Sequence, residues 1–200
     1  MERPLAFFGA FNPPTRAHLD LARFAARETG AEEVLFVPSK AAYIRQDQGK
    51  DFAYTDAQRL AMLRRAAESR PWMAVYDGEL GQERQPRTYE TLCRLREGGR
   101  TPRLLLGSDK LSELETGWRH VEEICREFGI VCLSRGGDRC AEMIAGDPYL
   151  SGLSPYIRVL ETPRETRGVS SSAVRARVAE IRRLTEEISA MIPPEILPML

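Results

Sequence analysis

The sequence lacks the features that mark membrane, secreted and disordered proteins. No uninterrupted apolar run in its 200 residues approaches the roughly 18 residues that suggest a membrane span. The N-terminus leads into only a short apolar stretch, residues 5–8, which does not fit a secretory signal. With 42% hydrophobic and 29% charged residues, the composition is that of an ordinary globular protein. We therefore expect a cytoplasmic protein with no membrane partner.

The sequence also lacks an excess of either charge. It has 29 Lys and Arg residues against 29 Asp and Glu residues, so the formal net charge is zero. A generally basic surface for nucleic acid is therefore absent, and we expect no nucleic-acid partner. Any site for a polyanion must be built locally.

Cysteine is scarce and follows no metal-binding pattern. Cys93, Cys125, Cys132 and Cys140 form no C-x-x-C pair and have no neighbouring His at zinc-finger spacing. We expect reduced, mostly buried thiols rather than a disulfide framework.

Short apolar runs alternate with amphipathic stretches along the chain. The runs predict strands at residues 5–8, 34–37, 73–76, 103–106, 130–133 and 156–160. The amphipathic stretches predict helices at 15–28, 56–69, 88–97, 118–127, 171–184 and 186–192. Because helices separate successive strands, the sequence predicts an α/β protein with a single doubly wound parallel sheet. We expect one domain over residues 1–200, C-terminal helices from about residue 171, and loops at 41–54 and 134–155.

The first strand-to-helix junction, GAFNPPTRAH at residues 9–18, is suited to an anion. Ligands of open α/β sheets bind beyond the carboxyl ends of the strands, and Gly9 lets a ligand approach the backbone closely. Thr15 and His18 lie on one face of the first helical turn, where the helix N-terminus favours negative charge. The alternative is that Thr15 is only an N-cap and His18 a packed helix residue.

Two later junctions carry further polar groups. At residues 168–175, GVSSSAVR offers three hydroxyls and the Arg175 guanidinium for phosphate oxygens, with Arg164 and Arg167 just before it; the serines could equally be caps. At residues 107–110, the Asp109 carboxylate could hold a ribose hydroxyl or cap the next helix. Trp118 could stack on a flat heterocycle or belong to the core. Neither a Walker-type loop nor a G-x-G-x-x-G motif is present.

Together these segments resemble the nucleotidyltransferase superfamily, and specifically the nicotinamide/nicotinate mononucleotide adenylyltransferases. Residues 9–18 match G-x-F-x-P-x-[HT]-x-x-H, and residues 169–175 match [IV]-S-S-[ST]-x-[IV]-R. The stretches 87–92, 106–109 and 114–118 look like further family segments, in the same order. Thr15 stands where many members have His, Ala17 where many have Gly, and Lys40 is a weak match to a lysine of the bacterial nicotinate enzymes.

The resemblance implies a Rossmann-like nucleotidyltransferase fold and a role for each matching residue. The residues of the transfer step would be His18, as a cation, with Thr15 and Arg175. Those that bind ATP would be Gly9, Ala10, Phe11, His18, Gly107, Asp109, Ser171, Ser172 and Arg175. Those on the mononucleotide side would be Thr88, Trp118 and Lys40.

The implied reaction joins ATP and a pyridine mononucleotide into a dinucleotide and releases pyrophosphate. Mg²⁺ would accompany ATP, held by phosphates and water, with no metal ligand from protein side chains. Two alternatives stay open: a nucleotidyltransferase with another phosphate acceptor, and a non-catalytic nucleotide-binding regulator. The sequence leaves open the choice between nicotinate and nicotinamide substrates, and whether the chain forms a homo-oligomer.

Overall fold

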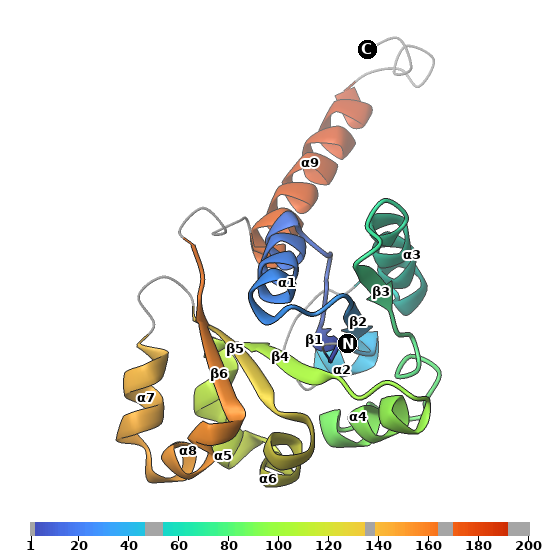
Figure 1. Ribbon diagram of the computed structural model, residues 1–200. Helices are drawn as coiled ribbons and strands as arrows, with labels where there is room; N and C mark the ends of the chain where they lie inside the picture. The colour runs from blue at the N-terminus through green and yellow to red at the C-terminus, as the bar shows by residue number, and fades with distance from the viewer. Residues whose placement is uncertain (1–2, 47–53, 135–138, 164–169, 192–200) are drawn as a thin grey trace.

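The computed structural model describes residues 3–46, 54–134, 139–163 and 170–191 (Figure 1). Six strands within these ranges form one sheet in the order β3-β2-β1-β4-β5-β6. The strands are β1 (Leu5–Gly9), β2 (Val34–Pro38), β3 (Met73–Val75), β4 (Arg103–Gly107), β5 (Ile130–Ser134) and β6 (Ile157–Glu161). All neighbouring strands run parallel. The predicted α/β class and parallel sheet are confirmed, while the single domain over residues 1–200 stays a prediction.

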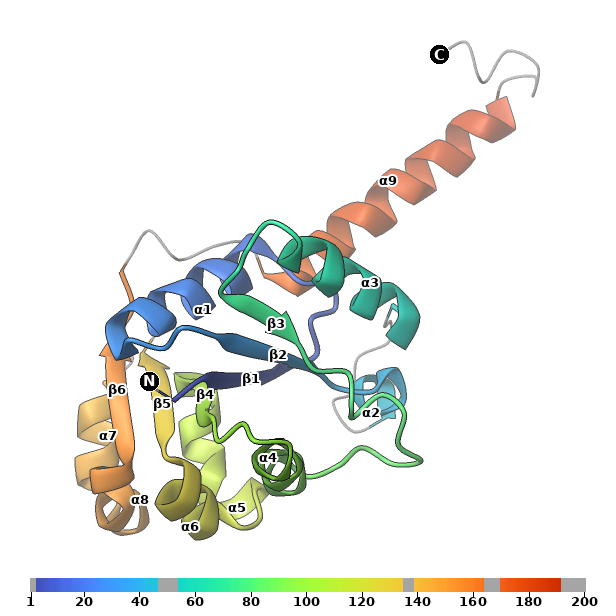
Figure 2. The same ribbon diagram turned by 45° about the vertical axis from the view of Figure 1, so that its right-hand side comes forward.

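Helices cover both faces of the sheet because the strands are apolar on both faces. In β4, Leu104 and Leu106 point into one core and Leu105 into the other, as successive side chains in a strand must. The face of Leu105 is covered by α1 (Arg16–Thr29) and α3 (Asp56–Ala67), seen above the sheet in Figure 2. The opposite layer consists of α4 (Thr88–Glu97), α5 (Leu114–Gly117), α6 (Val121–Glu123), α7 (Cys140–Gly146) and α8 (Pro148–Leu153).

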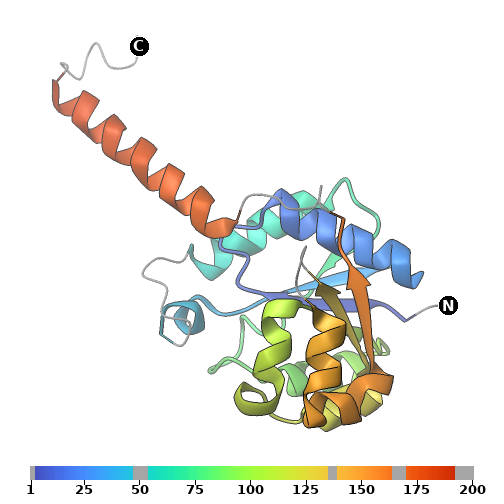
Figure 3. The same cartoon turned by 90° about the vertical axis from the view of Figure 1, so that its left-hand side faces the viewer.

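The last helix, α9 (Ser171–Met191), extends away from both layers (Figure 3). The prediction of two helices, 171–184 and 186–192, is wrong, because the helix is continuous through Met191. Neither glycine nor proline stands near residue 185 to stop it. Among the described residues, no helix combines the length and the apolar character that a membrane crossing needs.

Both segments predicted as loops contain short helices. Residues 41–54 begin with α2 (Ala41–Gln46), and residues 134–155 contain α7 and α8. Each of these helices has six or seven residues, which is fewer than two full turns. The polar composition dominates such a short window, so the helical period is not detectable there.

The predicted helix at 118–127 begins later than expected. Trp118 is extended and His120 is left-handed, with φ 60°, so α6 begins at Val121 and continues as a π-helical turn, η2 (Ile124–Phe128). A 3₁₀ helix, η1 (Ser108–Glu113), and α5 precede it and were missed. The four cysteines are free thiols, and three of them are buried.

Candidate active site

The candidate site lies where the order of the strands reverses. From β1 the chain proceeds outward to β2 and β3, and from β4 it proceeds in the other direction to β5 and β6. The loops that leave the adjacent strands β1 and β4 therefore diverge at their carboxyl ends, which is where open α/β sheets bind ligands.

Gly9, at the end of β1, makes room for a ring of the protein itself. A Cβ at this position would lie 3.1 Å from the tip of the Phe11 ring. That ring is 1% exposed and packs against Phe7 and Phe36, with centroid separations of 5.5 and 5.3 Å. Phe11 can therefore offer a ligand only its backbone, as the family resemblance implies.

His18 is oriented by the residue that begins its helix. Thr15 is the N-cap of α1, and its backbone N–H donates to His18 Nδ1 at 3.0 Å. Thr15 Oγ1 lies 2.8 Å from the same nitrogen. Because Nδ1 accepts the amide proton, the ring proton is on Nε2, which is a donor. The geometry thus favours a neutral imidazole instead of the cation expected from the resemblance.

The start of α9 is fixed on the loop that follows β1. Ser171 Oγ donates to the Pro13 carbonyl at 2.8 Å, and Arg175 Nη1 donates to the Asn12 carbonyl at 2.7 Å. Arg175 Nη2 also donates to Ser172 Oγ at 3.1 Å. The two motifs that carry the resemblance are therefore in contact, although more than 150 residues separate them.

Only one of the serines at the start of α9 is a cap. Ser170 Oγ accepts from the backbone N–H of Ala173 at 3.2 Å, which leaves Ser171 and Ser172 for other contacts. Arg164 and Arg167 lie outside the described residues.

The end of β4 reaches the same edge of the sheet as the end of β1. Gly107 is extended and caps η1, so Asp109 stands in the first turn of that helix and not at its N-cap. The Asp109 side chain is exposed, whereas Ser108 is buried. The carboxylate is accordingly at the surface beside the carboxyl end of β4.

A ring stack joins the two segments that carry the residues expected at the pyridine ring. Thr88 is the first residue of α4, and the next residue, Tyr89, stacks on His120 with 5.0 Å between ring centroids and 22° between planes. Trp118 precedes His120 by two residues and packs, half-buried, against the core beneath the sheet. The stack connects α4 with the segment that carries Trp118.

Lys40 holds a loop of the protein. Its Nζ donates to the Leu80 carbonyl at 3.0 Å and to the Gln82 carbonyl, and its backbone N–H donates to Gln85 Oε1 at 2.7 Å. The structure does not bring this ammonium group to the residues at the start of α1 and α9.

Sequence reasoning missed two buried charged residues beside this edge. Arg59 of α3 is 0% exposed. Glu79 is 1% exposed, accepts from Thr91 Oγ1 at 2.7 Å and Gln85 Nε2 at 2.5 Å, and burial raises its pKa to about 7. The signal for Arg59 is its place four residues before buried Leu63, on the buried side of α3. Glu79 has no such signal, since it lies in an irregular polar loop.

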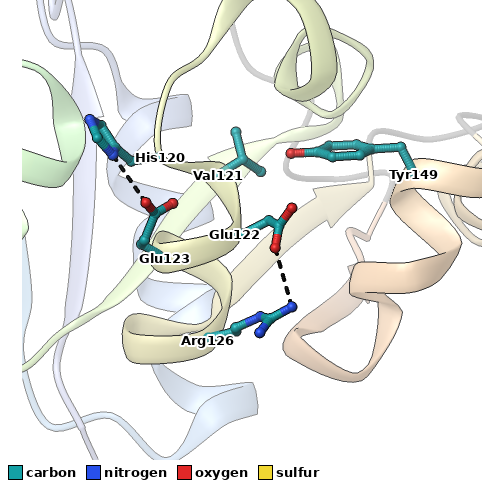
Figure 4. A pocket seen from close by; sticks show the side chains of 6 residues that line it. All are labelled: His120, Val121, Glu122, Glu123, Arg126 and Tyr149. Carbon is teal, nitrogen blue, oxygen red and sulfur yellow. Dashed lines mark hydrogen bonds and ion pairs between the residues drawn. The ribbon is translucent and has the colours of Figure 1, made fainter.

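A surface pocket of about 480 Å³ lies between α6 and α8 and is separate from the two motifs (Figure 4). Polar side chains that line it already have partners: His120 Nδ1 lies 3.2 Å from Glu123, and Arg126 lies 3.2 Å from Glu122. Tyr149 closes the side formed by α8. We assign no substrate to this pocket.

The sequence matches known proteins over most of its length. A model of the cytidylyltransferase-like family matches residues 6–177. A probable nicotinate-nucleotide adenylyltransferase of Carboxydothermus hydrogenoformans is 30% identical over 177 residues, which cover 87% of this chain and 85% of the relative. A probable nicotinate-nucleotide adenylyltransferase of Neisseria meningitidis is 31% identical over 194 residues, which cover 94% of this chain and 90% of the relative.

The fold also matches a solved structure. Plasmodium falciparum nicotinic acid mononucleotide adenylyltransferase complexed with APC superposes with a TM-score of 0.66 at 18% identity, covering 88% of this chain and 83% of that one. This similarity concerns the fold, whereas the family match spans nearly the whole sequence, both motifs included. The chain belongs to the cytidylyltransferase-like family.

Proposed function

We propose that the protein transfers the adenylyl group of ATP to nicotinate mononucleotide, or to nicotinamide mononucleotide, and releases pyrophosphate. The observation that carries this proposal is the contact of Ser171 and Arg175 with the loop after β1, beside the helix of His18. This contact brings hydroxyl, guanidinium and imidazole donors together where the order of the strands reverses. The names of the relatives indicate the molecule that accepts the adenylyl group, a nicotinate nucleotide.

The proposed reaction needs no covalent intermediate. An oxygen of the mononucleotide 5′-phosphate forms a bond to the α-phosphorus of ATP, and the bond from that phosphorus to the pyrophosphate oxygen breaks. The attacking oxygen is already anionic at pH 7, so no protein nucleophile is required. The protein must bring two polyanions together and stabilise the charge that develops on pyrophosphate.

Neutral donors and one cation perform this task. His18 donates from Nε2 to a phosphate oxygen, while Thr15 holds the ring in that tautomer. Arg175, with Ser171 and Ser172, binds the β- and γ-phosphates. The N-termini of α1 and α9 add the partial positive charge of the helix dipole.

The remaining family positions bind the nucleosides. The backbone of residues 9–11 lines the adenylate site, and Gly107 and Asp109 contact ribose or the mononucleotide. Thr88 and Trp118 bind the pyridine ring, Trp118 by stacking. Lys40 acts on this side through the loop that its ammonium group holds.

The donor set of the site suits phosphate more than a bare divalent cation. Among the described residues, no group of three or more His, Cys, Asp or Glu side chains could hold a metal ion. Mg²⁺ would therefore come with ATP, coordinated by phosphate oxygens and water. When bound, it would offset part of the negative charge of the triphosphate.

Product formation tests the proposal. The purified protein is incubated with ATP, Mg²⁺ and each mononucleotide, and the dinucleotide and pyrophosphate are quantified. We expect both products in equal amounts with at least one mononucleotide, and the ratio of the two rates identifies the preferred acceptor. No product with either mononucleotide would refute the proposal. Product with a pantetheine or sugar phosphate alone would indicate another acceptor, and ATP binding without turnover would indicate a regulator.

A further inference from the structure

A buried arginine joins the loops at the carboxyl ends of β1 and β2. Arg59, in the first turn of α3, donates from Nη1 to the Ala10 carbonyl at 2.6 Å and from Nε to the Tyr54 carbonyl at 3.3 Å. Its Nη2 donates to the Ser39 carbonyl and, at 2.6 Å, to Asp56 Oδ1. Three of these four acceptors are backbone carbonyls. The side chain thus fastens three stretches of chain that meet at one edge of the sheet.

Complete burial of this charge is unusual. Arginine is almost never fully buried unless it is paired, and the partner of Arg59, Asp56, keeps a side chain that is 35% exposed. Burial lowers the pKa of the guanidinium, while Asp56 raises it. An apolar side chain could fill the same space, but it would leave the carbonyls of Ala10, Ser39 and Tyr54 without this donor. The position therefore requires the donors of arginine and not only its volume.

The bond to Ala10 sets the orientation of one peptide group. In a planar trans peptide the C=O and the N–H point in opposite directions. Because Arg59 holds the Ala10 carbonyl, the Phe11 N–H points away from Arg59. Phe11 has φ 42°, in the left-handed region that bulky residues rarely adopt, and its ring is fixed in the core. The charged hydrogen bond stabilises this strained turn.

We propose that Arg59 is a positioning residue for ATP: it fixes the Ala10–Phe11 peptide so that the Phe11 N–H donates to a phosphate oxygen of ATP. The inference rests on the proposed function, because it assigns a role within the ATP site. Arg59 itself contacts no substrate. Figure 2 shows α2 at the ends of β1 and β2 and α3 above the sheet; the hydrogen bonds of Arg59 connect α3 with the loops that follow these two strands.

Variants at residue 59 separate positioning from general stability. Arg59→Lys keeps the charge but not the planar set of donors, and Arg59→Gln removes the charge. Arg65→Lys, at a residue of the same helix whose side chain is 82% exposed, is the matched control. Calorimetry measures ATP affinity, kinetics measure KM for both substrates, and thermal unfolding measures stability.

We expect Arg59→Lys to weaken ATP binding about tenfold or more, since bonds to a charged group are the strong ones. KM for the mononucleotide should stay within about twofold, and Arg65→Lys should match the wild type. Asp56→Asn, which removes the ion pair but leaves the Ala10 carbonyl bound to Arg59, should lose less ATP affinity than Arg59→Lys. Equal changes in KM for ATP and for the mononucleotide would overturn the proposal. An unchanged ATP affinity in a folded Arg59 variant would overturn it as well.

Two further measurements keep the test decisive. If the wild type binds ATP but forms no dinucleotide, the proposed function fails, while the role of Arg59 is still tested by ATP affinity. If neither Arg59 variant folds, the amide resonance of Phe11 in the wild type is followed by NMR during ATP titration. A shift and slower hydrogen exchange would support the proposal, and an unchanged Phe11 amide would overturn it.

Discussion

Replacing Glu79 by Gln should remove a pH dependence from the stability of the fold. Glu79 is 1% exposed and lies in the segment between β3 and α4. Burial is the main cause that raises the pKa of its carboxyl from 4.5 to about 7, and the hydrogen bonds from Thr91 and Gln85 oppose the rise. Because the folded protein binds this proton more tightly than the unfolded chain does, folding and protonation favour each other.

The magnitude follows from the difference between the two pKa values. A tenfold change in proton affinity is worth about 1.4 kcal/mol, so the rise from 4.5 to about 7 corresponds to about 3 kcal/mol. This stability is fully present below pH 4.5, is lost as the pH rises through about 7, and stays absent above that. Gln cannot ionise, so this pH-dependent contribution is absent from the free energy of unfolding of the Glu79→Gln variant.

Urea unfolding of both proteins from pH 4.5 to 8 measures the effect. The stability of the wild type relative to Glu79→Gln should fall by about 3 kcal/mol across this range. Glu83→Gln, at an exposed residue of the same segment, is the matched control and should not remove the fall of about 3 kcal/mol from the wild-type profile. Parallel pH profiles for the wild type and Glu79→Gln would show that burial does not raise the pKa of this carboxyl.

Three further variants test the proposed site. His18→Ala should lower kcat by about 10²–10³-fold in the dinucleotide assay, by analogy with the loss of one charge-stabilising donor, and an unchanged rate would exclude His18 from the transfer step. Trp118→Ala should raise KM for the mononucleotide about tenfold or more and leave KM for ATP unaltered, because stacking on one ring is worth about 1–3 kcal/mol; equal changes in both constants would contradict stacking. Arg175→Lys should raise KM for ATP about tenfold, since lysine lacks the planar donor set that reaches both the Asn12 carbonyl and Ser172, whereas Arg177→Lys, two residues along and exposed, should not. Equal KM values for these two arginine variants would argue against a phosphate role for Arg175.

The sheet could be predicted because its signal is local. Each strand is a short apolar run buried on both faces, and long amphipathic helices such as α1 show their period over several turns. The short helices α2, α7 and α8 do not extend far enough to show a period. The break before α6 depends on the left-handed backbone of His120, a conformation that the residue type does not disclose.

The proximity of the two motifs could be predicted, but the groups that support them could not. Parallel strands place their carboxyl ends at one edge, so the segments around His18 and Arg175, which each follow a strand, belong to the same edge of the sheet. Arg59 and Glu79 differ because their burial depends on tertiary partners: Arg59 bonds to the Ala10 carbonyl, 49 residues away, and Glu79 to Thr91 of α4. Whether a charged side chain is exposed or buried depends on those tertiary contacts, and the residue alone does not decide it.

Threonine at position 15 is compatible with the orientation of His18 because the decisive donor belongs to the backbone. The Thr15 N–H bonds to His18 Nδ1, and any residue except proline supplies that N–H. A histidine side chain at position 15 is therefore not needed to fix the tautomer. The proton on Nε2 makes His18 a donor without a net charge, so Arg175 and the helix N-termini supply the positive character of the site. A chain with no net charge can thus bind two polyanions, because the binding groups are concentrated at the starts of two helices.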